Sequence, residues 1–191
     1  MTALRSSDGP SLTASQFLSM DSSVFGGAWR YELVAGRPVA MSPPSPEHGR
    51  ILGNVVRKLQ SALDAAGRPC TVDPGVGVRP ANAPGDKVRV PDAVVMCRGA
   101  SGQDFAVVLI EVLSLSNAGA EYGQRRADLK AVEDVGEIVE LAQDGPAAQV
   151  FRRHEAGWLS SEVLGGDAVL RLESLGVEVR MGELYAGLRT P

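Results

Sequence analysis

Residues Val88 to Ser114 read VRVPDAVVMCRGASGQDFAVVLIEVLS and are the most informative segment of the chain about its fold. This segment predicts two apolar strands joined by a glycine-containing loop, because runs such as VVLI bounded by turn residues are typical of strands buried on both faces. Each strand carries one acid among aliphatic neighbours: Asp92 follows Pro91, and Glu111 interrupts VVLIEVL. A buried carboxylate is costly unless a cation or a hydrogen-bond donor meets it, so both acids are expected to have a partner or a function.

Two acids at the ends of adjacent strands allow two interpretations. Their oxygens could together hold one hard divalent cation, since such ions prefer carboxylate ligands. Alternatively, both acids face water or form salt bridges with a neighbouring arginine. The residues of these two strands leave both interpretations open.

The composition predicts one globular domain. The chain has 191 residues, 44% of them apolar, which is enough for a single domain over residues 12–191 behind a flexible tail over residues 1–11. No apolar run approaches the ~20 residues that span a bilayer, and the N-terminus lacks the apolar stretch of a signal peptide. Cys70 and Cys97 are expected to be buried thiols of a reducing compartment, not a disulfide or a metal pair. We therefore expect a cytoplasmic protein with no membrane partner.

The charge is spread unevenly along the chain. A net charge of −4 argues mildly against a protein that simply coats nucleic acid. Residues 1–130 contain 14 Lys and Arg against 12 Asp and Glu (+2), whereas residues 131–191 contain 5 against 11 (−6). The acidity belongs to the C-terminal third, so a phosphate backbone could still meet the first two-thirds.

A short helix, a hairpin and a long helix are expected before this stretch. Thr13-Ala-Ser-Gln16 has the spacing of a capping box and predicts the short helix. The segment WRYELVAGRPVAMS predicts a β-hairpin that turns at Ala35-Gly36, with Glu32 as a paired or exposed strand acid. Ser45 is the expected N-cap of the long helix, which ends at Gly67. Its apolar stripe comprises Ile51, Val55, Leu59 and Leu63.

The rest of the chain is predicted to be strands, one further long helix and a short last one. Strands are expected over Cys70–Asp73, Gly75–Arg79, Val88–Cys97, Phe105–Leu113, Gly136–Ala142, Gln149–Arg153, Trp158–Val163, Ala168–Leu172 and Val177–Arg180. The long helix is expected over Gly119–Asp134 and the last over Met181–Leu188. The first of these helices carries Arg125, Arg126 and Lys130. Such a cluster is usually a solvated face, but here part of it could reach the site at Glu111.

Several other chemistries are not indicated. The sequence contains no glycine-rich phosphate loop, no Cys/His cluster with zinc-ligand spacing and no serine or cysteine nucleophile signature. Two histidines leave little room for a catalytic triad.

The order of elements is similar to the core of the PD-(D/E)xK nucleases: a hairpin, a long helix, a strand with Pro-Asp, a strand with Glu and a basic helix. More closely, the chain resembles the Uma-type family of restriction endonucleases found in bacteria. The matching segments cover nearly the whole chain in order: LTASQFLSM, YELVAGRPVAMSPPSPEHGRI, VRVPDAVVM, LIEVLSLSNA, EYGQRR, the segment ending LAQDGPAAQVFRR, and SLGVEVRMGELYAGL. The resemblance implies a restriction-endonuclease-like fold of the α/β (α+β) class, with a central mixed β-sheet flanked by helices.

The resemblance also implies a metal site. The family's Pro-Asp matches Pro91-Asp92 and its second acid matches Glu111, which implies metal ligation by Asp92, Glu111 and the backbone carbonyl of Val112. Glu47-His48 matches a family segment suspected of lining the site, although a histidine at a helix start is more often a capping or solvent-facing residue. The implied cofactor is Mg²⁺, with Mn²⁺ as a possible substitute, and the implied partners are DNA and a second copy in a homodimer.

The chain departs from the family at the catalytic lysine. Nucleases with the D/E-x-K pattern carry it two residues after the second acid, where this chain has Leu113. The Uma-type family has it on the following helix in a Gly-Glu-Lys segment, where this chain reads Gly123-Gln124-Arg125. Arginine keeps the charge, but with a pKa above ~12 it cannot act as a base. Lys130, roughly one and a half turns further along the helix, is a possible substitute.

These features predict a Mg²⁺-dependent endonuclease that hydrolyses DNA phosphodiester bonds, with Arg125 or Lys130 stabilising charge. Two alternatives are a degenerate nuclease that still binds nucleic acid or metal, and a dimeric interaction module. The altered lysine motif favours the first and the acidic C-terminal third favours the second. If Asp92 and Glu111 are close, at least one should have a raised pKa, opposed by the nearby cations.

Overall fold

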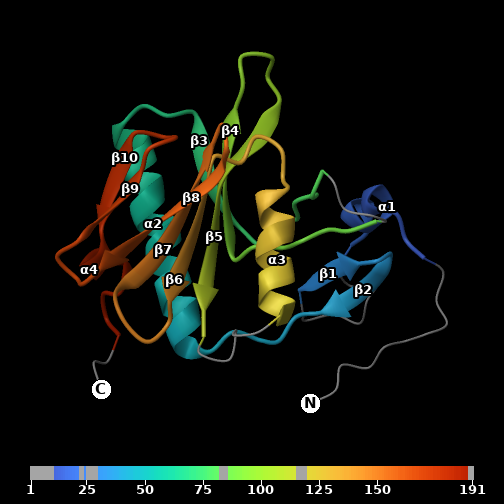
Figure 1. The fold of residues 1–191 in the computed structure, drawn as a ribbon, viewed down its shortest axis with the longest axis horizontal. Coiled ribbons are helices and arrows are strands. Elements are labelled where there is room, and N and C mark those ends of the chain that lie inside the picture. The colour runs from blue at the N-terminus through green and yellow to red at the C-terminus, as the bar shows by residue number, and fades with distance from the viewer. Residues whose placement is uncertain (1–10, 22–23, 25–29, 82–85, 115–119, 189–191) are drawn as a thin grey trace.

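A six-stranded mixed sheet runs through the computed structural model, which describes residues 11–21, 24, 30–81, 86–114 and 120–188. Within it β5 (Asp104–Leu113) and β6 (Glu137–Ala142) are parallel, while the other neighbouring strands are antiparallel. Helix α3 (Ala120–Lys130) connects the parallel pair (Figure 1). The strands lie in the order β3 (Cys70–Pro74), β4 (Ala93–Arg98), β5 (Asp104–Leu113), β6 (Glu137–Ala142), β7 (Ala147–His154) and β8 (Gly157–Leu164).

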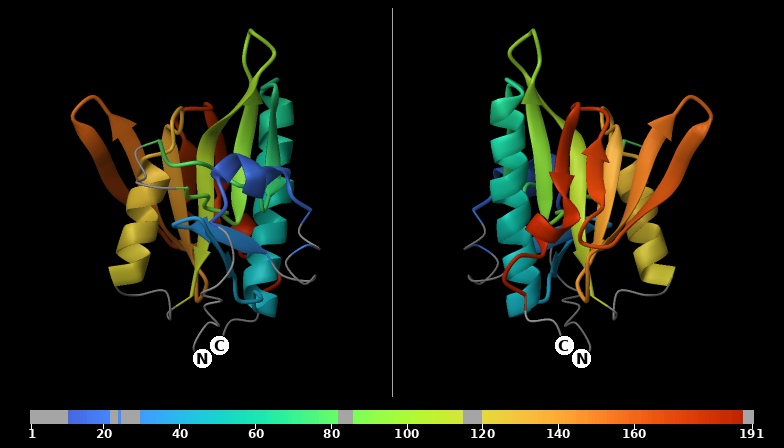
Figure 2. Two further views of the ribbon diagram at one scale, coloured as in Figure 1. Left: turned by 90° about the vertical axis from the view of Figure 1, so that its right-hand side faces the viewer. Right: turned by 90° about the vertical axis from the view of Figure 1, so that its left-hand side faces the viewer.

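The two faces of the sheet are covered by different helices, as Figure 2 shows. Ile110 and Val112 of β5 pack with α2 (Pro46–Ala65) on one face, whereas Leu109 packs with α3 on the other. Side chains alternate along a strand, so Glu111 shares the α3 face with Leu109. The face of α2 also holds β9 (Val169–Leu172), β10 (Val177–Arg180) and α4 (Met181–Leu184).

Helix α2 forms where the capping residues predict it. The Ser45 hydroxyl accepts a hydrogen bond from the His48 N–H at 3.1 Å, and Pro46 occupies the first turn. The residues of the predicted stripe are the ones that the helix buries. Gly67, with φ at +63°, follows its C-terminus. No helix among the described residues is long and apolar enough to span a membrane.

The N-terminal elements form a small layer at the edge of the α3 face (Figure 1). Helix α1 (Ala14–Ser19) begins with the predicted capping box, and β1 (Tyr31–Val34) pairs with β2 (Arg37–Ala40) as an antiparallel hairpin. Gly36 turns this hairpin at φ +74°, and a Cβ there would lie 2.0 Å from Ser11 Oγ. Leu33 pairs with Val88, which ties the hairpin to the segment that leads into β4.

Three sequence predictions are corrected by the structure. Gly75–Arg79 is not a strand, because its only described pairing is an isolated bridge between Val78 and Arg89. The strand predicted to begin at Val88 begins at Ala93, since Val88 to Val90 cross toward the hairpin instead of joining the sheet. Cys70 and Cys97 are bonded in a disulfide, because they face each other across β3 and β4 with their Cα atoms 4.0 Å apart. The cysteines therefore do not support a reducing compartment.

The predicted tail, apart from residue 11, lies outside the described residues, as does Gly119 at the predicted start of α3. The other predicted strands and the last helix match observed elements, with ends that shift by a few residues.

Candidate active site

Asp92 lies immediately before β4 and is held by several donors. Its side chain is 6% exposed. Oδ2 accepts a hydrogen bond from the Val112 N–H at 2.9 Å, while Oδ1 lies 3.1 Å from His48 Nε2 and 3.2 Å from Arg30 Nη2. Burial would raise the pKa of Asp92, but the contact with His48, the Val112 N–H and the Arg30 charge together lower it. Asp92 is therefore a carboxylate that the fold keeps ionised.

Glu111 comes from the neighbouring strand, and fewer hydrogen-bond donors balance its carboxylate than that of Asp92. Arg125 Nε and Nη2 both donate to Oε1, at 3.1 and 2.8 Å, so Oε2 receives no hydrogen bond from this guanidinium. Burial raises the pKa of Glu111 to about 8; Arg125 opposes the rise, and the charges of Asp92 and Glu32 add to it. This confirms the expected raised pKa, with Arg125 as the opposing cation.

Arg125 joins Glu111 to a second acid. Its Nη1 donates to Glu32 Oε1, and its Nη2 also donates to the Val90 carbonyl at 3.1 Å. The charges of Glu111 and Glu32 raise the pKa of Arg125 even though burial alone would lower it. Each nitrogen of this guanidinium is thus engaged inside the protein.

A chain of alternating charges continues from Glu32 through Arg89 to Asp128 of α3. Arg89 donates to Glu32 Oε2 at 2.7 Å and to Asp128 Oδ2 at 2.6 Å. Lys87 donates to both oxygens of Asp128, at 2.9 and 3.0 Å. Asp128 lies one helical turn after Arg125, so the two residues fix the same face of α3 against the hairpin and the segment before β4.

A cavity of about 580 Å³ lies between the α2 N-terminus, the hairpin, the start of β4 and the C-terminal end of β5. The predicted residues that line it are His48, Asp92, Glu111, Val112 and Arg125. Val112 turns its N–H toward Asp92. In an antiparallel pairing the N–H and C=O of one residue point to the same side, so its carbonyl points that way as well.

Two predicted residues are not brought to this cavity. Lys130 Nζ lies 4.2 Å from the ring centre of Phe151 and 5.8 Å from that of Trp158, over β7 and β8. Glu47 is exposed on the first turn of α2. Of the two candidates for the cation near Glu111, the structure places Arg125 there.

Sequence reasoning missed Arg30, Glu32 and Arg89 as members of the site. All three line the cavity. Glu32 was expected to be a paired or exposed strand acid, and it is paired. The contact of Arg30 with Asp92 spans 62 residues of sequence, and that of Glu32 with Arg89 spans 57. Residue spacing along the sequence does not predict contacts over such separations. One sequence feature pointed to the site, namely the charge of Glu32 in the otherwise uncharged strand YELV.

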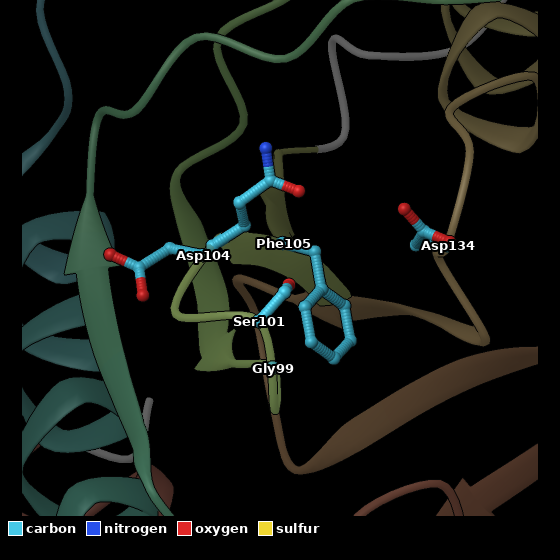
Figure 3. A pocket seen from close by; sticks show the side chains of 6 residues that line it. Gly99, Ser101, Asp104, Phe105 and Asp134 are labelled. Atoms are coloured by element: carbon cyan, nitrogen blue, oxygen red, sulfur yellow. The ribbon is translucent and has the colours of Figure 1, made fainter.

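A second hollow, of about 490 Å³, lies at the opposite end of β4 and β5. Figure 3 shows Ser101 and Phe105 near its centre, with Asp134 across from them and Asp104 turned away from the Phe105 ring. Asp104 pairs instead with the exposed Arg98 at 3.0 Å. This hollow lacks converging buried charges, so the cavity at Asp92 is the stronger candidate.

The cavity fits a hard cation with few protein ligands. Among the described residues, no group of three or more His, Cys, Asp and Glu side chains is arranged to hold a metal ion. Two carboxylates and a main-chain carbonyl are hard oxygen donors, which Mg²⁺ prefers, and Mg²⁺ usually keeps several waters. The buried charge of Glu111, only partly balanced by Arg125, would be stabilised by such a cation.

Comparison with known proteins gives a family and a fold. Residues 14–182 match the family described as "Uma2: Putative restriction endonuclease". A crystal structure of a protein described as "a putative nuclease belonging to DUF820", from Anabaena variabilis ATCC 29413, superposes with a TM-score of 0.67 at 17% sequence identity. The match covers 92% of this chain and 98% of that one, and confirms the predicted mixed α/β fold. No curated protein matches the chain at a significant level.

Proposed function

We propose that this chain, which belongs to the Uma2 restriction endonuclease family, is a Mg²⁺-dependent endonuclease that hydrolyses DNA phosphodiester bonds in the cavity at Asp92. The observation that carries the proposal is the convergence of two buried carboxylates from neighbouring strands on one cavity. The DNA substrate is inferred from the family, and the metal-dependent chemistry is inferred from the residues that line the cavity.

Asp92, Glu111 and the Val112 carbonyl would hold the Mg²⁺, with Mn²⁺ as a substitute. When bound, the ion supplies charge neutralisation at the phosphate and a water of lowered pKa. The protein prepares the ligands beforehand: Arg30, His48 and the Val112 N–H fix the orientation of Asp92. Arg125 fixes the orientation of Glu111.

The cations around the cavity also suit an anionic substrate. The Arg30 side chain is 33% exposed at the cavity wall, so its remaining donors can meet a phosphate oxygen. Arg125 is more deeply placed, at 15% exposure, and holds two acids. We therefore assign Arg30 to contact with the phosphate, and Arg125 to positioning Glu111 and to stabilising charge.

A second candidate function is a degenerate nuclease that binds DNA or metal without cleaving. One observation favours it: the residue at the family's lysine position is an arginine whose three nitrogens are all engaged by Glu111, Glu32 and the Val90 carbonyl. Among the described residues that line the cavity there is no lysine.

Cleavage assays on plasmid and single-stranded DNA distinguish these functions. We expect the wild-type chain to cleave with Mg²⁺ or Mn²⁺ and to lose cleavage in EDTA. Asp92→Asn should abolish cleavage, whereas the matched variant Asp104→Asn, at the far end of the same strands, should cleave like the wild type. Cleavage by Asp92→Asn at the wild-type rate would refute the proposal. Binding of Mn²⁺ by a wild-type chain that cuts neither substrate would support the degenerate alternative.

A further inference from the structure

The two edges of the central sheet differ in how their outer backbone groups are satisfied. At the β3 edge, the Gln60 side chain of α2 accepts a hydrogen bond from the Val72 N–H at 2.9 Å and donates to the Cys70 carbonyl at 3.2 Å. At the other edge, no strand of the described residues pairs with the outer side of β8. Figure 2 shows the β7–β8 hairpin projecting from the rest of the sheet.

The outward backbone groups of β8 can be identified from its pairing with β7. The Gly165 N–H donates to the Pro146 carbonyl at 2.8 Å, next to the registered pair of Leu164 with Ala147. Hydrogen-bonded pairs alternate along an antiparallel ladder, so the odd-numbered residues of β8 point their backbone groups toward β7. The even-numbered residues point theirs outward: Trp158, Ser160, Glu162 and Leu164.

The side chains of β8 are also unusually exposed for an apolar strand. Leu159 and Leu164 are 62% and 65% exposed, the highest values among the large apolar residues that the structure describes. An eight-residue edge strand with such side chains is a template for a further strand, and proteins normally shield it.

The sequence of β8 is complementary to itself in one antiparallel register. If a two-fold axis passes at Ser161, outward residues pair with outward residues, and apolar side chains pair with apolar ones on both faces. Trp158 then faces Leu164 of the second copy, and Leu159 faces its Val163. Two neighbouring registers are less favourable. A two-fold axis at Glu162 places this residue opposite its own copy, and a two-fold axis at Ser160 places Trp158 opposite Glu162 of the second copy.

We propose that β8 is the interface for a second copy of this chain, joined as an antiparallel pair about a two-fold axis at Ser161. The same patch serves both copies, as a closed two-fold dimer requires. Two six-stranded sheets thereby become one continuous sheet. This interface does not depend on whether the cavity at Asp92 is catalytic.

A cysteine scan of β8 tests the register. Residue 161 and its copy would form a non-hydrogen-bonded pair with Cα atoms about 4.5 Å apart, within reach of a disulfide. Residue 160 and its copy would be offset by two positions and lie about 8–9 Å apart, beyond that reach. We expect Ser161→Cys to form a cross-linked dimer on mild oxidation and the matched variant Ser160→Cys to remain uncross-linked. Cross-linking of both or of neither would overturn this register.

Sedimentation of the wild-type chain and of Ser160→Pro tests the surface itself. We expect the wild type to sediment at twice its mass of 20.0 kDa as concentration rises. Proline at position 160 removes an outward N–H and keeps the bonds to β7, so this variant should sediment as a monomer with its melting transition retained. A monomeric wild type, or a Ser160→Pro variant that still dimerises, would overturn the proposal.

Discussion

Glu111 and Glu137 are both buried glutamates on neighbouring parallel strands, at 4% and 2% exposure, yet the fold treats them differently. Glu137 receives hydrogen bonds from Arg152 Nε at 2.9 Å, from the N–H groups of Glu173 and Ser174, and from the Ser174 hydroxyl. Glu111 is hydrogen-bonded by Arg125 and has two acids nearby that raise its pKa. Glu137 is a structural acid that closes the turn between β9 and β10, whereas Glu111 lies at the cavity and its hydrogen bonds come from Arg125.

The largest expected effect lies on the structural side of this comparison. Glu137→Gln should destabilise the fold by about 3–5 kcal/mol, because Arg152 would lose the charge that balances it in a buried pair. Urea denaturation at pH 7 measures this loss. The matched variant Glu155→Gln, in the exposed turn between β7 and β8, should unfold like the wild type. Equal stability of Glu137→Gln and Glu155→Gln would show that the two buried glutamates do not differ as described.

Glu111 predicts the opposite response to pH. Its pKa rises from 4.5 to about 8 in the folded chain. The stability that comes from its protonated form is therefore complete below pH 4.5 and is lost as pH rises toward 8. The slope between those values approaches about 1.4 kcal/mol per pH unit at most. In EDTA, Glu111→Gln should remove the pH dependence of the unfolding free energy and should be at least as stable as the wild type at pH 8. If Glu111→Gln is less stable than the wild type at pH 8, Glu111 is a structural acid like Glu137.

Arg125 should show a smaller effect. Arg125→Lys keeps the charge but cannot bridge Glu111, Glu32 and the Val90 carbonyl with one planar group. We expect a stability loss of about 1–3 kcal/mol in urea, nearly unchanged Mg²⁺ affinity, and faster metal-dependent cleavage because an ammonium can orient the attacking water. Lys130→Ala should leave the cleavage rate unchanged. Loss of cleavage in Lys130→Ala, with no change in Arg125→Lys, would show that Lys130 and not Arg125 stabilises charge during cleavage.

The sheet and its helices were largely predictable because each is a local pattern. The VVLI run of β5, the cap at Ser45 and the hairpin turn at Ala35-Gly36 each specify their own element. The segments before β4 were not, because Val78 and Val88 alternate like strand residues but are buried by the hairpin and α3. The disulfide was missed because sequence does not show that Cys70 and Cys97 share a register.

The candidate site was predictable in its acids and not in its cations. Asp92 and Glu111 stand out because a carboxylate in an apolar strand is costly. Arg125, Arg126 and Lys130 all lie on α3. The sequence does not show how this helix is rotated about its axis, so it could not predict which of the three cations contacts Glu111. Arg126 pairs with Glu140 of β6, at 2.7 and 2.6 Å. Arg30 reaches Asp92 only because Leu33 of the hairpin pairs with Val88, in the segment that leads into β4.

Calorimetric titration of the metal-free chain with Mn²⁺ tests the two-carboxylate site most directly. A two-carboxylate site predicts binding of one Mn²⁺ per chain by the wild type and by Asp104→Asn, and loss of that binding in both Asp92→Asn and Glu111→Gln. Wild-type affinity for Mn²⁺ in Asp92→Asn and Glu111→Gln would contradict it.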